Sequence, residues 1–116
     1  MPSKNPAQRL SDIVDNIDAI EAFTLGLEFG KFAGSKDLYA VVRALEIVSE
    51  ATRRLPADLQ DRHPEIDWIA VAAAGNVYRH KYDGVDERLI WHTVRHDLSA
   101  LLSVASMELE RVRDTL

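Results

Sequence analysis

Residues 75–82 read GNVYRHKY and bring together three side chains that can do chemistry, Arg79, His80 and Tyr82. A histidine has an ordinary pKa of about 6.5, so His80 can take up or release a proton at neutral pH. The planar guanidinium of Arg79 can bind two oxygens of an anionic group at once. The pattern therefore predicts acid-base chemistry beside a bound anion. It also fits a plain helix end, because the helix dipole favours His80, Arg79 and Lys81 there, and Tyr82 alone could simply pack.

His92 and His96 form a second group of interest, because residues four apart on a helix can hold one metal ion. A third ligand would have to come from elsewhere, and the glutamate of an H-E-x-x-H motif is absent. We therefore predict histidines that are solvated or lie in an interface, and a protein without a metal or cofactor.

Two further basic groups could extend a surface that binds phosphate. They are the pair Arg53 and Arg54, and Arg62 with its neighbour His63. Charged side chains of this kind are mostly solvated, so the sequence predicts an exposed face and not a site.

Length and composition limit what can surround these residues. The chain has 116 residues, 47% of them hydrophobic and 28% charged, which is typical of one globular domain spanning residues 1–116. It has no cysteine, so a disulfide scaffold and a thiol nucleophile are excluded. A net charge of −5 argues against indiscriminate binding to nucleic acid. No apolar run reaches the roughly 18 to 20 residues of a membrane span, and no secretion signal precedes Leu10, so we expect a cytoplasmic protein.

Apolar residues recur at steps of three and four in four segments, which predicts four helices. The first covers residues 10–25 and follows a loose terminus at residues 1–7. The second begins after Ser35 as N-cap and ends near Leu55, just before Pro56. No segment alternates with period two for long enough to indicate a strand.

The third predicted helix starts with Pro64 at its first position, has Glu65 and Asp67 in its first turn, and carries the GNVYRHKY stretch. The fourth follows Asp86 as its cap and continues to Val112. Because the connections are short, the sequence predicts an all-α protein, an antiparallel four-helix bundle.

The order of the chain resembles the HepT-like branch of the HEPN superfamily, formerly a domain of unknown function. The resemblance covers residues 9–112. It lies in the segments DIVDNIDAIEAF, DLYAVVRALEIVSEATRRLP, HPEIDW, NVYRHKYDGVD and LIWHTVRHDLSALL. It implies a helical bundle that forms a homodimer through the motif helix. It also implies a ribonuclease toxin paired with a small nucleotidyltransferase antitoxin.

The family motif is an arginine, then four to six residues, then histidine, any residue and tyrosine. By this resemblance the histidine is His80, the tyrosine is Tyr82, and the polar residue after the arginine is Asn76. The arginine itself is missing, because Gly75 stands in its place. Arg79 follows one helical turn later and is the natural substitute.

Metal-independent RNA cleavage needs a base for the 2′-hydroxyl, an acid for the 5′ leaving oxygen and a cation beside the phosphorane. His80 suits the proton transfers, Asn76 can orient groups, and Arg79 can supply the cation. The resemblance also makes Tyr82 an RNA contact and the residue to which the partner nucleotidyltransferase attaches AMP. Two alternatives stay open. One is a catalytically inactive HEPN domain that binds a nucleotide, RNA or a protein partner, and the other is the metal-binding bundle.

Overall fold

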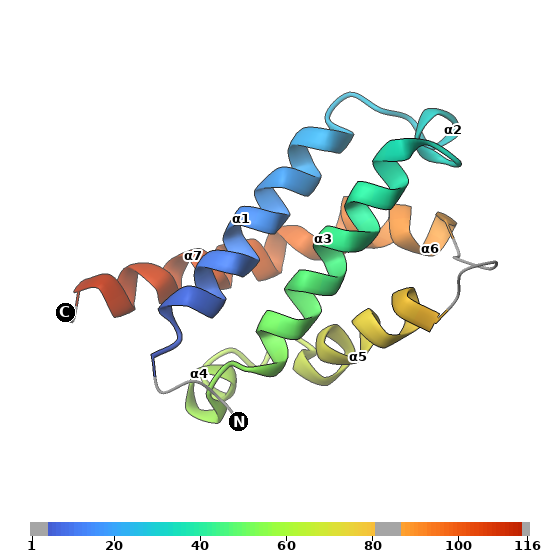
Figure 1. Ribbon diagram of the computed structural model, residues 1–116. Helices are drawn as coiled ribbons and strands as arrows, with labels where there is room; N and C mark the ends of the chain where they lie inside the picture. The colour runs from blue at the N-terminus through green and yellow to red at the C-terminus, as the bar shows by residue number, and fades with distance from the viewer. Residues whose placement is uncertain (1–4, 81–86, 115–116) are drawn as a thin grey trace.

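The computed structural model describes residues 5–80 and 87–114, with the side chains of residues 75–80 left out. Within these ranges the chain is helical and contains no strand, which confirms the all-α prediction (Figure 1). The elements are α1 (Ala7–Thr24), α2 (Phe29–Phe32), α3 (Lys36–Arg53), α4 (Ala57–Asp61), α5 (Trp68–His80), α6 (Glu87–His92), the π-helical segment η1 (Thr93–Asp97) and α7 (Leu98–Asp114).

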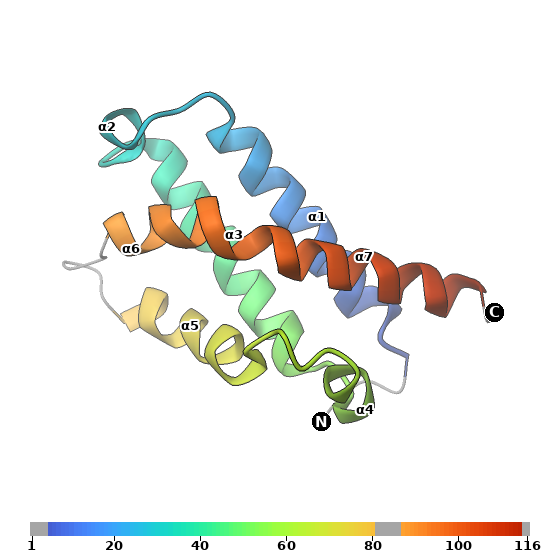
Figure 2. The same ribbon diagram turned by 180° about the vertical axis from the view of Figure 1, so that it is seen from behind.

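The helices form a bundle around one apolar core. α1 packs against both α3 and α7, and α3 packs against α5 on its other side (Figures 1 and 2). Leu10, Ile13, Ile17 and Ile20 make the fully buried stripe of α1. Their spacing of three and four residues is the pattern from which the helix was predicted.

The first two predicted helices exist, with small changes at their ends. α1 starts three residues before Leu10 and is followed by a turn at Gly26, whose φ of 75° favours glycine. Ser35 is the N-cap of α3 as predicted. Its hydroxyl, however, donates to the Phe32 carbonyl at 2.7 Å instead of capping α3. It thereby ties α2 to the start of α3.

The third predicted helix begins later than expected, at Trp68 and not at Pro64. The carboxylate of Asp67 accepts a hydrogen bond from the Ala70 N–H at 3.1 Å, so Asp67 caps the helix. The preceding turn is held because the Trp68 indole donates to the carbonyls of Gln60 and His63, both at 3.0 Å. Ile66 is buried between these contacts, and this anchoring is incompatible with a helix that starts at Pro64.

The last predicted helix is divided into α6, η1 and α7, while its proposed cap, Asp86, lies outside the described residues. In η1 the helix is wound more loosely than an α-helix, a feature that recurs at functional sites. Arg95 extends from η1 and donates to the carbonyls of Thr24 and Leu27 at 2.9 and 2.8 Å. It therefore ties η1 to the end of α1 and to the turn that follows, where the Thr24 carbonyl also accepts from the Leu27 N–H at 3.0 Å.

Candidate active site

The predicted catalytic motif occupies the end of α5. Asn76, Arg79 and His80 belong to this helix, although their side chains are not described, and Tyr82 lies outside the described residues. Because α5 is continuous through His80, positions 75 and 79 lie one helical turn apart on the same side of it. The backbone is thus compatible with Arg79 replacing a cation lost at position 75, and the roles of the four residues stay predictions.

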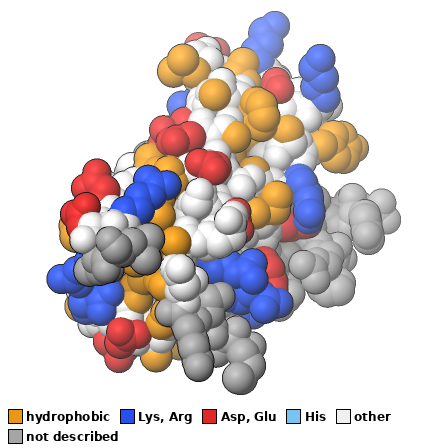
Figure 3. Space-filling view, turned by 60° about the vertical axis from the view of Figure 1, so that its left-hand side comes forward, with side chains coloured by type: hydrophobic (Ala, Val, Ile, Leu, Met, Phe, Trp, Pro, Cys, Tyr) orange, Lys and Arg blue, Asp and Glu red, His pale blue; other side chains and the backbone are white. Residues whose placement is uncertain are grey.

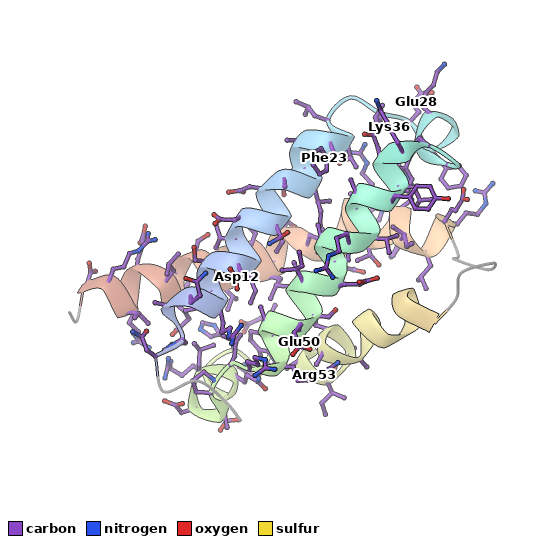
Figure 4. All side chains as sticks on the ribbon, viewed as in Figure 1. Asp12, Phe23, Glu28, Lys36, Glu50 and Arg53 are labelled. Atoms are coloured by element: carbon purple, nitrogen blue, oxygen red, sulfur yellow. The ribbon has the colours of Figure 1, made fainter. Side chains whose placement is uncertain are left out.

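α5 is fixed to α3 by Arg53, which the sequence had placed on a solvated face. Its guanidinium donates to the Ala72 carbonyl at 2.8 Å and pairs with Glu50 at 3.3 Å. Figure 4 shows Glu50 and Arg53 together on α3 above the start of α5. Arg54 pairs with the same carboxylate at 3.0 Å. These contacts position the motif helix and leave Arg53 occupied by protein acceptors.

A groove of about 630 Å³ runs beside α5, bounded on its other sides by α3, η1 and α7. Most of its lining is apolar, and its polar groups include three carboxylates, from Glu65, Asp67 and Asp97. These carboxylates disfavour a phosphate in the groove, which is also lined by His96 of η1.

The outer side of α5 is apolar and exposed. Ile69 is 84% exposed, and Ala70 and Ala73 are exposed as well. Position 80 lies seven residues, or two turns, after Ala73, so the stripe that starts at Ile69 continues toward the position of His80. The motif helix therefore presents an uncovered apolar side.

Away from the motif, Arg62 is exposed as predicted, but His63 is buried, which corrects the prediction for that residue. Both contact Glu108 of α7, whose side chain is 2% exposed. Arg62 donates to one carboxylate oxygen at 2.6 Å, and His63 Nε2 lies 3.1 Å from the other. Arg111 lies 3.7 Å from the same oxygen as His63. Three basic groups therefore surround one buried carboxylate, joining the connection before α5 to α7.

The sequence analysis missed Glu108, although the chain holds a signal for it. The residue continues the stripe of buried positions Leu101, Val104 and Ala105 on the core side of α7. A carboxylate in that position must be paired, and basic residues elsewhere in the chain are the expected partners.

The environment of Glu108 sets its ionisation. Burial alone disfavours the charged carboxylate, but hydrogen bonds from Arg62 and His63 and attraction by Arg62 and Arg111 outweigh burial and lower the pKa of Glu108. Its stabilising contribution is then complete above the unfolded-state pKa of about 4.3 and is lost as the pH falls through the lower folded value.

Glu108→Gln is expected to lower the free energy of unfolding at pH 7 by about 1 to 3 kcal/mol, because it removes a charged partner of Arg62 and His63. The loss stays moderate since the Arg62 side chain is 39% exposed and can be hydrated again. Urea unfolding from pH 7 to pH 3 measures it. The difference from the wild type should shrink below pH about 4.

Glu110→Gln, an exposed change on the same helix, is the matched control. Asp58 and Glu65, which pair with Arg62 and His63, are present in the wild type and in both variants, so the comparison isolates Glu108. A difference that stays constant down to pH 3 would contradict the assigned direction of the pKa change.

His92 and His96 lie exposed on α6 and η1, with ring centroids 4.6 Å apart. Their location off the buried stripe agrees with the prediction. Among the described residues no group of three histidine or carboxylate side chains is arranged to hold a metal ion. No helix of the described chain combines the length and apolar character of a membrane span.

The fold and the motif together define a helical domain whose last α5 turn carries the histidine. The chain belongs to the HepT-like ribonuclease family, because the family described as "Ribonuclease HepT-like" matches residues 13–107. This confirms the family that the sequence segments indicated.

Curated relatives give the same result. A protein named "Probable ribonuclease HepT" from Thermococcus cleftensis is 42% identical over 93 residues, which is 79% of this chain and 84% of the relative. A "Putative RNase" from Methanocaldococcus jannaschii is 33% identical over 99 residues, covering 84% and 82% of the two chains. Another from Caldanaerobacter subterraneus is 30% identical, covering 84% and 88%. No solved structure matches the chain significantly.

Proposed function

We propose that this protein is a metal-independent endoribonuclease, the toxin of a HEPN/nucleotidyltransferase toxin-antitoxin pair, with activity weakened by the loss of the motif arginine. The observation that carries the proposal is a histidine-x-tyrosine sequence that begins at His80, the last residue of α5, in a chain that belongs to a ribonuclease family. His80 exchanges the protons, Asn76 orients the reacting groups, and Arg79 stabilises charge on the phosphorane.

Each chain supplies only one motif histidine, whereas the reaction needs a base and an acid. A two-fold homodimer that joins the motif helices brings a second histidine to the site. The exposed apolar side of α5 supports this arrangement, because Ile69 and Ala73 lie on the helix that the dimer would bury. The groove on the other side of α5 offers further apolar surface for the second copy.

Cleavage of a labelled single-stranded RNA by the purified protein in EDTA tests the proposed function. We expect scission in EDTA that His80→Ala abolishes. If EDTA instead stops cleavage and zinc restores it, the site at His92 and His96 would replace the motif as the candidate centre.

Ile69→Asp is expected to weaken the homodimer by at least about a hundredfold, because dimerisation would bury an unpaired carboxylate. The variant should fold, since position 69 is the second residue of α5, where a negative charge is favourable. Light scattering over a concentration series measures the change. Met107→Asp, at a residue of α7 that is 58% exposed, is the control. A wild type that is monomeric at micromolar concentration would contradict a site formed by the motif histidines of two chains.

Tyr82 is proposed as the AMP acceptor through which the partner nucleotidyltransferase silences the toxin. A phosphate attached two residues after His80 would occupy the place of the substrate phosphate. Incubation of the pair with ATP should raise the intact mass by one or more AMP groups. Labelling that persists in Tyr82→Phe would place the modification elsewhere.

A second function is favoured by one specific observation, the glycine at position 75. Without the family's arginine, the same chain can serve as an inactive HEPN domain that binds a nucleotide, RNA or a protein partner. This function predicts that the wild type binds RNA without cleaving it and that His80→Ala does not change this behaviour, which distinguishes it from the nuclease.

A further inference from the structure

An aromatic and cationic stack joins α2 to α6 and runs from the core to the surface. The buried ring of Phe32 lies 5.0 Å from that of Trp91, which is 6.3 Å from Phe29 in an edge-to-face arrangement. The guanidinium of Arg88 lies over the Phe29 ring, 4.5 Å from its centroid. The stack therefore ends in a cation on a rigid aromatic support.

The two arginines of this region differ in what they are free to bind. Arg95 lies over Trp91 at 4.2 Å, and its Nη2 donates to the carbonyls of Thr24 and Leu27, so this nitrogen is already bound to protein acceptors. Arg88 is exposed, and its guanidinium forms no ion pair within the described residues. Among these residues its N–H donors have no carboxylate partner and can serve a ligand, while Phe29 holds the plane in place.

The stack lies at the same end of the molecule as the motif. Figures 1 and 2 show α2, α6 and the C-terminal end of α5 on one side of the bundle, opposite the C-terminus of the chain. Arg88 follows His80 by eight positions in the sequence, so their Cα atoms are at most roughly 28 Å apart. A short single strand can reach both.

The mixed charges around the stack favour contact with a single nucleotide over contact with an extended nucleic-acid backbone. Lys31 lies on α2 and Lys36 is the first residue of α3, but Glu28 and Glu87 precede Phe29 and Arg88 in sequence. On another face, seen in Figure 3, basic and acidic side chains are interspersed among the described residues. Because Glu28 and Glu87 lie next to Phe29 and Arg88, a ligand at this end would be held by planar stacking and one phosphate contact, which suits an unpaired nucleotide and not a duplex backbone.

We propose that Arg88, supported by Phe29 and Trp91, is a binding site for a nucleotide of single-stranded RNA next to the one that is cleaved. The guanidinium stacks on the base with its outer face and donates to a phosphate with its edge. The proposal rests on the proposed function, since it names how that site holds its substrate. It adds a specific residue outside the histidine motif.

Fluorescence anisotropy with a labelled 2′-O-methyl RNA of about 12 nucleotides, which cannot be cleaved, tests the proposal. We expect Arg88→Ala to raise Kd on the order of ten- to a hundredfold and to reduce the salt dependence of log Kd by about 0.7. Arg88→Lys should keep the salt dependence but recover only part of the affinity, because a lysine cannot stack as a plane. Arg113→Ala, at an exposed arginine near the opposite end of the bundle, is the matched control and should bind normally.

A purely structural role for Arg88 predicts lower thermal stability with unchanged binding in the folded variants, and this result would overturn the proposal. So would a loss of affinity no larger than that of Arg113→Ala. The outcome is separable from the nuclease itself. If RNA binding depends on Arg88 but the wild type does not cleave RNA, the proposed nuclease function is excluded and the proposed Arg88 binding site is supported. If Arg88→Ala leaves cleavage unchanged, only the proposed Arg88 binding site is excluded.

Discussion

Arg79→Ala is expected to lower the rate of RNA cleavage by about a hundred- to a thousandfold, the effect of removing one preorganised donor that stabilises a developing charge. The reason is the absence of a side chain at position 75, which leaves Arg79 as the cation one turn along α5. Single-turnover cleavage of a labelled RNA in EDTA measures the rate. His80→Ala should reduce it at least as much.

Arg54→Ala provides the comparison, because it removes a partly exposed cation that pairs with Glu50 on α3. We expect nearly normal cleavage from this variant once its stability is matched. If Arg79→Ala cuts RNA as fast as Arg54→Ala does, another group supplies the charge at the phosphate.

The regular helices α1 and α3 could be predicted because the spacing of their apolar residues is a local property of each segment. In α1 the residues Ile13, Ile17 and Ile20 mark the buried side without reference to any other element. The same holds for Leu38, Val41 and Leu45 in α3. Local periodicity was enough to predict both helices to within a few residues.

The start of α5 could not be obtained in this way, because a tertiary contact decides it. Pro64 has a good preference for the first position of a helix, and the sequence offers no local reason against it. The indole of Trp68 reaches back to the carbonyls of Gln60 and His63 and holds the intervening residues in a turn. The helix therefore begins at Trp68, and Asp67, which had been predicted to lie in its first turn, is its cap.

The contacts of the basic residues show the same limit. Arg62 and His63 are 46 and 45 residues from Glu108 in sequence, so only the packing of α7 against the rest of the chain brings them together. The histidine motif, by contrast, was found because its members are close in sequence. The structure adds that Asn76, Arg79 and His80 lie on a continuous helix whose outer side is apolar.

Gly75→Arg is expected to raise RNA cleavage, because it restores the arginine of the family motif while every present motif residue is kept. Position 75 lies in the interior of α5, where glycine is less favourable than arginine by several tenths of a kcal/mol up to about 1 kcal/mol. The variant should therefore also resist thermal unfolding slightly better. Cleavage rates and growth inhibition on expression measure the gain.

Gly75→Ala separates the two effects, since it gives α5 the stability of a helix former without the cation. Cleavage that rises in Gly75→Arg but not in Gly75→Ala would assign the gain to the guanidinium. A marked loss of stability in both would instead identify Gly75 as a packing residue in the small run that begins at Ala72. A contrary result would be a Gly75→Arg variant that folds and stays dimeric but does not cleave RNA, together with a wild type that is also inactive and is unchanged by Arg79→Ala. This result would exclude the nuclease function and favour the inactive binding domain. Retained RNA binding through Arg88 would then indicate what that domain holds.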